Sequence, residues 1–376
     1  MLSTDIIVVG AGIAGASAAA EMAAEAAVVM VDMESQPGYH ATGRSAAYFA
    51  TSYGKRIVQE ITASCESFLL DPPAGFTEVD LLLPRDNMFF ARGDQAESLA
   101  ALAAKNPHLE AVDETTIRER VPVFRPGYLH GGLWDRKGGD LDVDALLQAF
   151  VRQFRIRGGQ LYSRHRVTRI DRVGGQWIVT AGERQFSAPV LVNAAGGWVE
   201  EIAGLAGLGS LGIKPFRRTA LTIEAPAGVD ISGWPEMVDV DEDFYFKPDA
   251  GLIMISPADE TATRPADVQA EEIDVAMGVH RFEQATGLDI RQVRARWAGM
   301  RTFAPDRLFV AGFDPRAEGF FWLAGQGGVG VQSSPAMARL ASYLVTGAEP
   351  EGDFAAVKQY IDELAPDRLL YDLSGH

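Results

Sequence analysis

The stretch IIVVGAGIAG, residues 6–15, decides the fold of this chain. Residues 6–9 form a short β-branched apolar run, which is typical of a strand buried on both faces. The run stops at Gly10, Gly12 and Gly15, where the spacing G-x-G-x-x-G permits a tight turn, a ligand close to the backbone and a tightly packed helix. An ordinary glycine-rich turn is the alternative. The helix expected from residue 13 and the second strand, VVMVD, ending at Asp32, favour a dinucleotide site.

Composition narrows the class of protein. The chain has 376 residues, enough for two domains, and a formal net charge of −17. That charge argues against nucleic acid as a partner and against anionic membrane surfaces. Cys65 is the one cysteine in the sequence, which fits a reducing compartment, and it is expected to be a buried small hydrophobe. The histidines show no metal-ligand spacing, so no metal site is expected.

The sequence shows no segment apolar enough to span a membrane and no basic region of the kind that opens a signal peptide. We therefore expect a cytoplasmic protein, with peripheral attachment to the inner membrane left open.

Nucleotide-binding and β-rich segments alternate along the chain. We predict an α/β fold in which a Rossmann-like FAD-binding domain is interleaved with a β-rich (α+β) substrate-binding domain. The first domain is expected to comprise residues 1–80, 140–208 and 302–376. The second is expected to comprise residues 81–139 and 209–301.

Four motifs together resemble one known family. They are VVGAGIAG at 8–15, GYHATGRSAA at 38–47, LVNAAGGW at 191–198 and GFFWLAGQGGVGVQSSPA at 319–336. The chain resembles the D-amino acid oxidase and glycine oxidase superfamily of FAD-dependent oxidoreductases, most of all the bacterial D-arginine dehydrogenase-type members. The resemblance covers essentially the whole chain, and it implies non-covalently bound FAD.

The resemblance also implies which residues surround the cofactor. Those at 42–45 would lie against the flavin and its phosphate tail, Val167 would present its backbone to the adenine, and the loop 327–330 would lead into a helix aimed at the flavin. A flexible glycine hinge is the alternative for that loop. The expected cofactor residues are Gly10, Gly12, Ile13, Ala14, Gly15, Asp32, Met33, Thr42, Gly43, Arg44, Ser45, Ala46, Val167, Ala195, Gly196, Trp198, Arg301, Gly327, Gly328, Val329, Gly330 and Gln332.

A substrate carboxylate is best held by the planar fork of an arginine. The resemblance assigns Arg301 as the main carboxylate ligand and Arg218 as its helper, with Arg217 competing for the second role. Tyr245 and Tyr53 match active-site tyrosines, although strand aromatics more often belong to a core. Gln332 and the Gly328 carbonyl are expected to contact the substrate amine.

Two positions depart from the D-arginine-preferring relatives. Asn87 stands where those relatives carry a glutamate that pairs with a guanidinium, and Tyr48 stands where they carry a histidine. An amide does not offset the desolvation of a cation as a carboxylate does. A neutral or apolar D-amino acid, or another acid with a secondary or primary amine, is therefore expected as a substrate at least as much as D-arginine.

The implied reaction moves a hydride from the amino acid Cα to the flavin and gives an imino acid, which hydrolyses to a 2-oxo acid and ammonia. Oxygen or a quinone- or dye-like acceptor would then reoxidise the flavin. Two alternatives remain: oxidation of a 2-hydroxy acid on the same fold, and a flavin-binding protein without catalysis.

Overall fold

The computed structural model describes residues 1–372. Its first sheet has the strand order β10-β3-β2-β14-β22-β21, in which β21 alone runs antiparallel to its neighbour. These strands are β2 (Ile6–Val9), β3 (Val28–Val31), β10 (Gln160–Tyr162), β14 (Val190–Asn193), β21 (Val310–Phe313) and β22 (Phe320–Ala324). Every residue of β2 is buried, as the sequence predicted.

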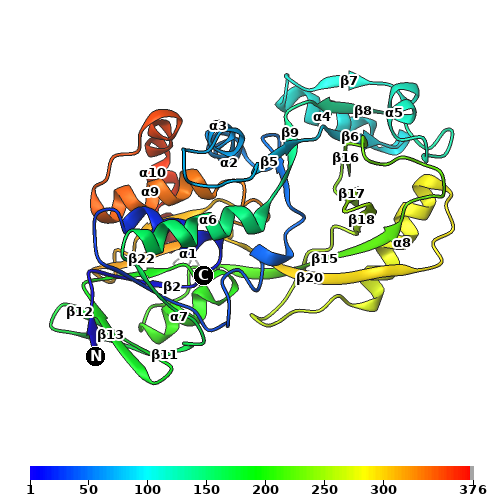
Figure 1. Cartoon of the computed structure of the whole chain (residues 1–376). Coiled ribbons are helices and arrows are strands. Elements are labelled where there is room, and N and C mark those ends of the chain that lie inside the picture. The colour runs from blue at the N-terminus through cyan, green and yellow to red at the C-terminus, as the bar shows by residue number, and fades with distance from the viewer. Residues whose placement is uncertain (373–376) are drawn as a thin grey trace.

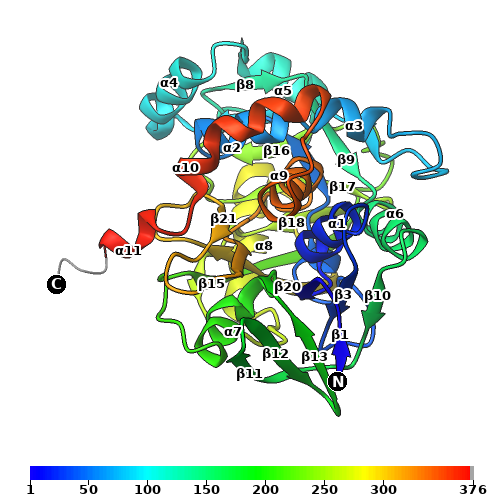
Figure 2. The same ribbon diagram turned by 90° about the vertical axis from the view of Figure 1, so that its left-hand side faces the viewer.

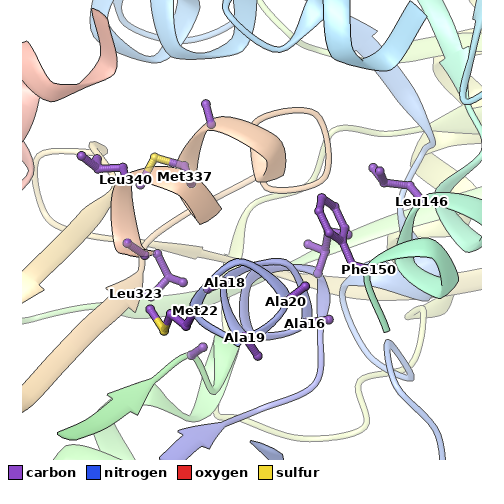
Figure 3. Packing of buried hydrophobic residues seen from close by; sticks show 14 of the residues in the cluster. Ala16, Ala18, Ala19, Ala20, Met22, Leu146, Phe150, Leu323, Met337 and Leu340 are labelled. Carbon is purple, nitrogen blue, oxygen red and sulfur yellow. The ribbon is translucent and has the colours of Figure 1, made fainter. Parts of the chain in front are cut away.

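Both faces of this sheet are covered, which explains the unbroken apolar run in β2. Ile6 and Val8 face the helices α1 (Ile13–Met22), α6 (Val143–Ile156) and α9 (Ser334–Thr346). The alanines of α1 keep its surface small, so α6 and α9 both pack closely against it (Figure 3). Ile7 and Val9 face a four-stranded sheet and α7 (Val199–Leu205) on the other side. The strands of that sheet are β1 (Leu2–Ser3), β11 (Val167–Val173), β12 (Gln176–Ala181) and β13 (Arg184–Ala188).

A larger mixed sheet forms the second lobe (Figure 1). Its order is β19-β15-β18-β17-β16-β6-β8-β7, with β20 pairing to β15. The strands are β6 (Asn87–Ala91), β7 (Glu110–Val112), β8 (Gly131–Asp135), β15 (Lys214–Glu224), β16 (Glu236–Asp239), β17 (Tyr245–Asp249), β18 (Leu252–Ser256), β19 (Thr261–Ala262) and β20 (Val293–Phe303).

Alternating residues of this sheet belong to two clusters. Met237 and Phe246 pack with Phe282 of α8 (Glu272–Thr286), whereas Val238 and Tyr245 belong to a cluster on the opposite face. Because successive side chains of a strand point to opposite faces, this alternation fixes which residues face the other lobe.

The long strands β15 and β20 pair with each other and run from one lobe to the other (Figure 1). Figure 2 shows the left-hand side of Figure 1, where α1 lies between α9 and α6. A third sheet, β4-β9-β5, contains β4 (Tyr48–Ala50), β5 (Leu82–Pro84) and β9 (Gly138–Leu141). The predicted α/β fold class is confirmed. The third sheet joins strands from both predicted domains, so the proposed residue boundaries stay a prediction.

Candidate active site

A single cavity of about 980 Å³ is lined by both lobes. Its wall includes the glycine turn at residues 10–14, here called the nucleotide turn, the loop 325–332 and residues of strands β15, β16, β17 and β20. All five residues predicted to be catalytic line it. So do the predicted cofactor residues, with the exceptions of Gly15 and Gly43.

The three glycines of the turn have separate packing reasons. Gly10 has a φ of 105°, and a Cβ there would lie 2.4 Å from the Ala194 carbonyl oxygen. A Cβ on Gly15 would lie 1.9 Å from the Gly10 carbonyl oxygen, so Gly15 serves helix packing behind the cavity. Gly43 likewise packs on the Gly38 carbonyl oxygen, 2.7 Å from an added Cβ. Gly12 faces the cavity, where a ligand needs open backbone.

Two polar side chains hold this turn in place. Asp32 accepts hydrogen bonds from the backbone N–H of Ala11 (2.6 Å) and of Glu34 (2.7 Å). Burial raises the pKa of Asp32 above its ordinary value, against the lowering effect of those hydrogen bonds. Thr42 accepts a hydrogen bond from the Ile13 N–H at 3.0 Å, at the start of α1. An ionised carboxylate has about four acceptor positions, so Asp32 retains capacity for a ribose hydroxyl.

Arg44 lines the cavity, and its side chain is bound to the second lobe. Its guanidinium donates to the carbonyl oxygens of Val268 (2.9 Å) and Ala298 (3.0 Å) and pairs with Asp267. The side chain therefore ties the 42–45 turn to the second lobe. The direction of the Arg44 side chain is thus set by Asp267 and Val268, which lie more than 200 residues away in the sequence.

The predicted carboxylate ligands come together on one face of the large sheet. The Arg301 Nη2 lies 3.4 Å from the Tyr245 hydroxyl. In the β15–β20 pair, Arg301 stands opposite Phe216. Arg218 follows Phe216 by two residues on β15, so Arg218 and Arg301 lie on the same face of the sheet. Among the described residues, neither Arg218 nor Arg301 has a carboxylate within ion-pair distance. Burial, with the neighbouring Arg301 charge, lowers the pKa of Arg218. Two adjacent cations without an anion suit an anionic ligand.

Arg217 points to the opposite face, which decides between the two neighbouring arginines. It pairs with Glu271, which directly precedes α8, and with Asp274 on α8 at 2.8 Å. Arg218 therefore faces the cavity, and Arg217 fastens α8 to the sheet.

The glycines of the last motif fit against the arginine. A Cβ on Gly328 would lie 2.8 Å from the Arg301 Cζ, and a Cβ on Gly327, whose φ is 55°, would meet the Phe303 ring at 2.3 Å. Helix α9 begins at Ser334 and carries Pro335 in its first turn, as expected.

The side-chain amide of Gln332 is bound at both ends by the protein itself. Its side chain is 2 % exposed, its oxygen accepts from the Ala50 N–H (3.0 Å), and its nitrogen donates to the Ala50 carbonyl (3.2 Å). Both ends of the amide are thus bound to the β4 backbone, which gives Gln332 a structural role. Gln332 also lines the cavity, and its contact with a substrate amine stays a prediction.

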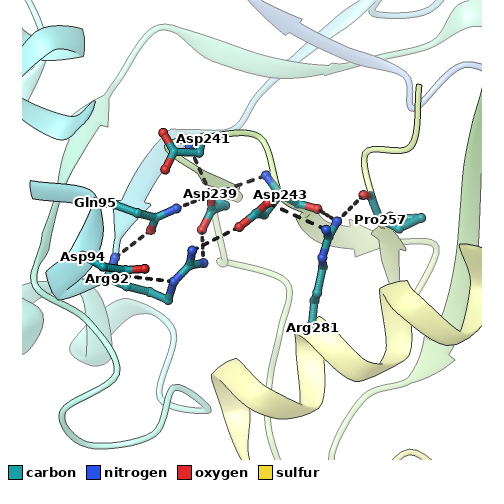
Figure 4. Close-up of polar contacts among 8 residues, drawn as sticks. All are labelled: Arg92, Asp94, Gln95, Asp239, Asp241, Asp243, Pro257 and Arg281. Carbon is teal, nitrogen blue, oxygen red and sulfur yellow. Dashed lines mark hydrogen bonds and ion pairs between the residues drawn. The ribbon is translucent and has the colours of Figure 1, made fainter. Parts of the chain in front are cut away.

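A buried network holds the turn that precedes Tyr245. Asp239 is fully buried and accepts hydrogen bonds from Arg92 (2.9 Å), Gln95 (2.8 Å) and the Asp241 N–H (3.0 Å) (Figure 4). Arg281 of α8 donates to the Asp243 and Pro257 carbonyl oxygens. Tyr245 therefore projects into the cavity from a turn that side chains on two sides restrain.

Sequence reasoning missed Glu236, which lines the cavity and is 2 % exposed. Tyr53 donates a hydrogen bond of 2.6 Å to its Oε2. Burial raises the pKa of Glu236 from 4.5 to about 7. The available signal was an acid inside the buried strand EMVD, a placement that apolar strands do not favour.

Asn87 lies beside Glu236 in the pairing of β6 with β16. Its side chain is fully buried but does not line the cavity, and neither amide atom has a hydrogen-bond partner among the described residues. The expectation that residue 87 faces the far end of a substrate is therefore wrong. Tyr48 does line the cavity, with its hydroxyl donating to the Arg85 carbonyl (2.7 Å).

Within residues 1–372, no group of potential metal ligands gathers, and no helix is long and apolar enough to cross a membrane.

Known proteins match the chain over nearly its whole length. Glycine oxidase of Pseudomonas putida is 25% identical over 366 residues, covering 93% of this chain and 96% of the relative. The crystal structure of glycine oxidase from Geobacillus kaustophilus superposes with a TM-score of 0.81 at 20% identity, covering 95% of this chain and 98% of the other. L-proline dehydrogenase from P. horikoshii gives 0.81 at 17% identity, covering 99% of each chain.

The family model described as "DAO: FAD dependent oxidoreductase" matches residues 5–344. That range contains the glycine turn, both arginines of the cavity and the last glycine loop. The chain belongs to this family of FAD-dependent oxidoreductases.

Proposed function

We propose that the chain oxidises a D-amino acid at Cα to an imino acid, which water converts to a 2-oxo acid and ammonia. The observation that carries the proposal is the unpaired couple Arg218 and Arg301, which lines the same cavity as the nucleotide turn. A pair of adjacent, partly buried cations favours an anionic ligand, because an anion offsets both their desolvation and their mutual repulsion.

The residues present fit FAD. Gly12 leaves backbone open at the start of α1, where N–H groups and the helix dipole favour a pyrophosphate. This turn, Arg301 and residues 325–332 all line the same cavity. When bound, the flavin accepts the hydride from the substrate. Cys65 does not line the cavity, so a cysteinyl link to the flavin is not part of the proposal.

The protein side chains bind and orient the substrate. The Arg301 fork is suited to hold both carboxylate oxygens, the Tyr245 hydroxyl to donate to one of them, and Arg218 to neutralise the remaining charge. With the carboxylate fixed at this end, Cα is held in one orientation relative to the cofactor.

D configuration is proposed from the resemblance to D-amino acid dehydrogenases carried by the sequence motifs. Relatives named for glycine or L-amino acids make glycine and the L series necessary competitors in any test. Oxygen or a quinone-like acceptor is proposed to reoxidise the flavin, in a cytoplasmic enzyme.

The test is anaerobic mixing of the purified yellow protein with single D- and L-amino acids, glycine and 2-hydroxy acids. We expect D-amino acids to bleach the flavin band and yield a 2-oxo acid after re-aeration or dye addition. Bleaching by 2-hydroxy acids alone would mean that the substrate is a 2-hydroxy acid and not an amino acid. A flavin that none of these compounds bleaches would favour a binding protein without catalysis.

A further inference from the structure

Four polar residues form a row across the cavity-side face of the large sheet. In the strand pairing, Asp135 of β8 stands opposite Asn87 of β6, and Asn87 stands beside Glu236 of β16. Val238 pairs with Tyr245, so the same register brings Lys247 of β17 opposite Glu236. Each of the four is at most 2 % exposed.

The cations near this row are already used. Lys247 Nζ pairs with Asp140 at 2.8 Å, and Arg85 Nε pairs with the other oxygen of Asp140 at 2.6 Å. Glu236 therefore has no cation of its own. The one hydrogen bond that its carboxylate receives from the described residues comes from the Tyr53 hydroxyl, to Oε2. A buried carboxylate that lines a reaction cavity in this state can take up a proton.

The position of Glu236 separates it from the carboxylate end of the cavity. It stands two residues from Val238, the partner of Tyr245, and two residues of a strand span about 7 Å. The Tyr53 ring packs in the same apolar cluster as Val238 and Tyr245. Tyr53 therefore connects Glu236 with the cluster that contains Tyr245, and all three residues line the cavity.

An α-amino acid reaches an enzyme at neutral pH chiefly as the ammonium ion, and hydride leaves Cα only when the nitrogen has a free electron pair. Resting on the proposed function, we propose that Glu236 accepts the proton of the substrate α-ammonium through the hydroxyl of Tyr53. One N–H bond of the ammonium breaks and its proton joins the Tyr53 oxygen. The original hydroxyl proton moves to Glu236 Oε2, leaving a neutral amine and a neutral carboxylic acid.

The surroundings of Glu236 support a proton acceptor that works near neutrality. Burial and Asp140 raise its pKa to about 7, whereas Tyr53, Lys247 and Arg301 favour the carboxylate. Tyr48 faces the same group but donates to the Arg85 carbonyl. Burial and the Glu236 charge raise the pKa of Tyr53 well above its ordinary value, so the phenol stays protonated and transfers only in concert.

The experiment measures kcat/KM against pH for a D-amino acid with a neutral side chain. Glu236→Gln keeps the shape and removes the proton acceptor. We expect a loss of about 100-fold or more at pH 7. The loss should shrink about tenfold for each pH unit above that, as the free amine becomes available. Tyr53→Phe, which keeps the carboxylate and removes the bridge, should shift the profile the same way.

Asp135→Asn is the matched control, since it neutralises a buried acid of the same row that does not line the cavity. Its pH profile should follow the wild type, and flavin content and melting temperature are measured for every variant. If Glu236→Gln does not fold, Tyr53→Phe decides.

Wild-type apparent pKa values in Glu236→Gln, or a loss equal at every pH, would overturn the proton acceptor alone. A loss confined to substrates with cationic side chains would also overturn it, by placing Glu236 on the substrate side chain. A wild-type enzyme that oxidises no amino acid would instead overturn the proposed function, and this inference with it.

Discussion

Arg301 Nη2 and the Tyr245 hydroxyl, 3.4 Å apart, join strands β20 and β17 at the end of the cavity that carries unpaired positive charge. The same sheet face carries Glu236, a buried acid without an ion-pair partner in the described part of the chain, two residues along β16 from the strand partner of Tyr245. A substrate with an anionic and a protonated end therefore meets complementary groups. The following predictions test this arrangement.

Arg217 and Arg218 are adjacent in sequence but should differ in function. Arg218→Ala removes a charged hydrogen-bond donor, worth about 1.5–3 kcal/mol, so kcat/KM should fall about 10- to 150-fold at unchanged stability. Arg217→Ala leaves Glu271 and Asp274 without their cation. It should cost about 3 kcal/mol in the free energy of unfolding. Steady-state kinetics and denaturant titration separate the two, and a larger kinetic loss in Arg217→Ala would reverse the assignment.

Gln332 should matter for stability. Gln332→Ala leaves the buried N–H and C=O of Ala50 unpaired, at about 1–3 kcal/mol for each group. Gln326→Ala is the control, because Gln326 lines the same cavity and its Nε2 has no partner among the described residues. Chemical denaturation should show the larger loss for Gln332→Ala. If Gln332→Ala left the free energy of unfolding unchanged and raised KM, the side chain of Gln332 would instead contact the substrate.

Glu236 should make stability fall as pH rises. Its pKa is raised from 4.5 to about 7 on folding, so between these values the folded protein holds a proton that the unfolded chain releases. The stability present below pH 4.5 is lost progressively toward pH 7, by at most about 3 kcal/mol at 1.36 kcal/mol per unit. Glu236→Gln should flatten this slope in denaturation curves from pH 5 to 8, whereas Glu78→Gln, at an exposed site, should not. Parallel slopes for wild type and Glu236→Gln would contradict the prediction.

Much of the fold and cavity follows from local sequence. The apolar run at 6–9 and the glycine spacing determine the strand, the turn and the helix. A Cβ on Gly10 or Gly15 would clash with backbone of the same strand–helix unit or of the neighbouring strand end. The arginines of the cavity were predicted by family resemblance, and alternation along β15 explains why Arg218 rather than Arg217 faces inward.

The missed features depend on contacts between distant segments. Arg44 turns toward Asp267, and Gln332 binds Ala50, partners that no local pattern names. Glu236 of β16 accepts a hydrogen bond from Tyr53, which follows β4 and lies 183 residues away in the sequence. Asn87 lies on a strand, as the sequence predicted, but the burial of its side chain depends on the strands β8 and β16 on either side.

The central claim is that Arg301 binds the substrate carboxylate, and kcat/KM of flavin-loaded Arg301→Ala with the best D-amino acid tests it most directly. Losing one partner of a buried charge pair costs about 2–5 kcal/mol, so kcat/KM should fall about 30- to 5000-fold. Arg301→Lys should recover only part of this, since an ammonium lacks the two parallel donors of the guanidinium. FAD content should stay at the wild-type level. A flavin-loaded Arg301→Ala enzyme with wild-type kcat/KM would contradict the account.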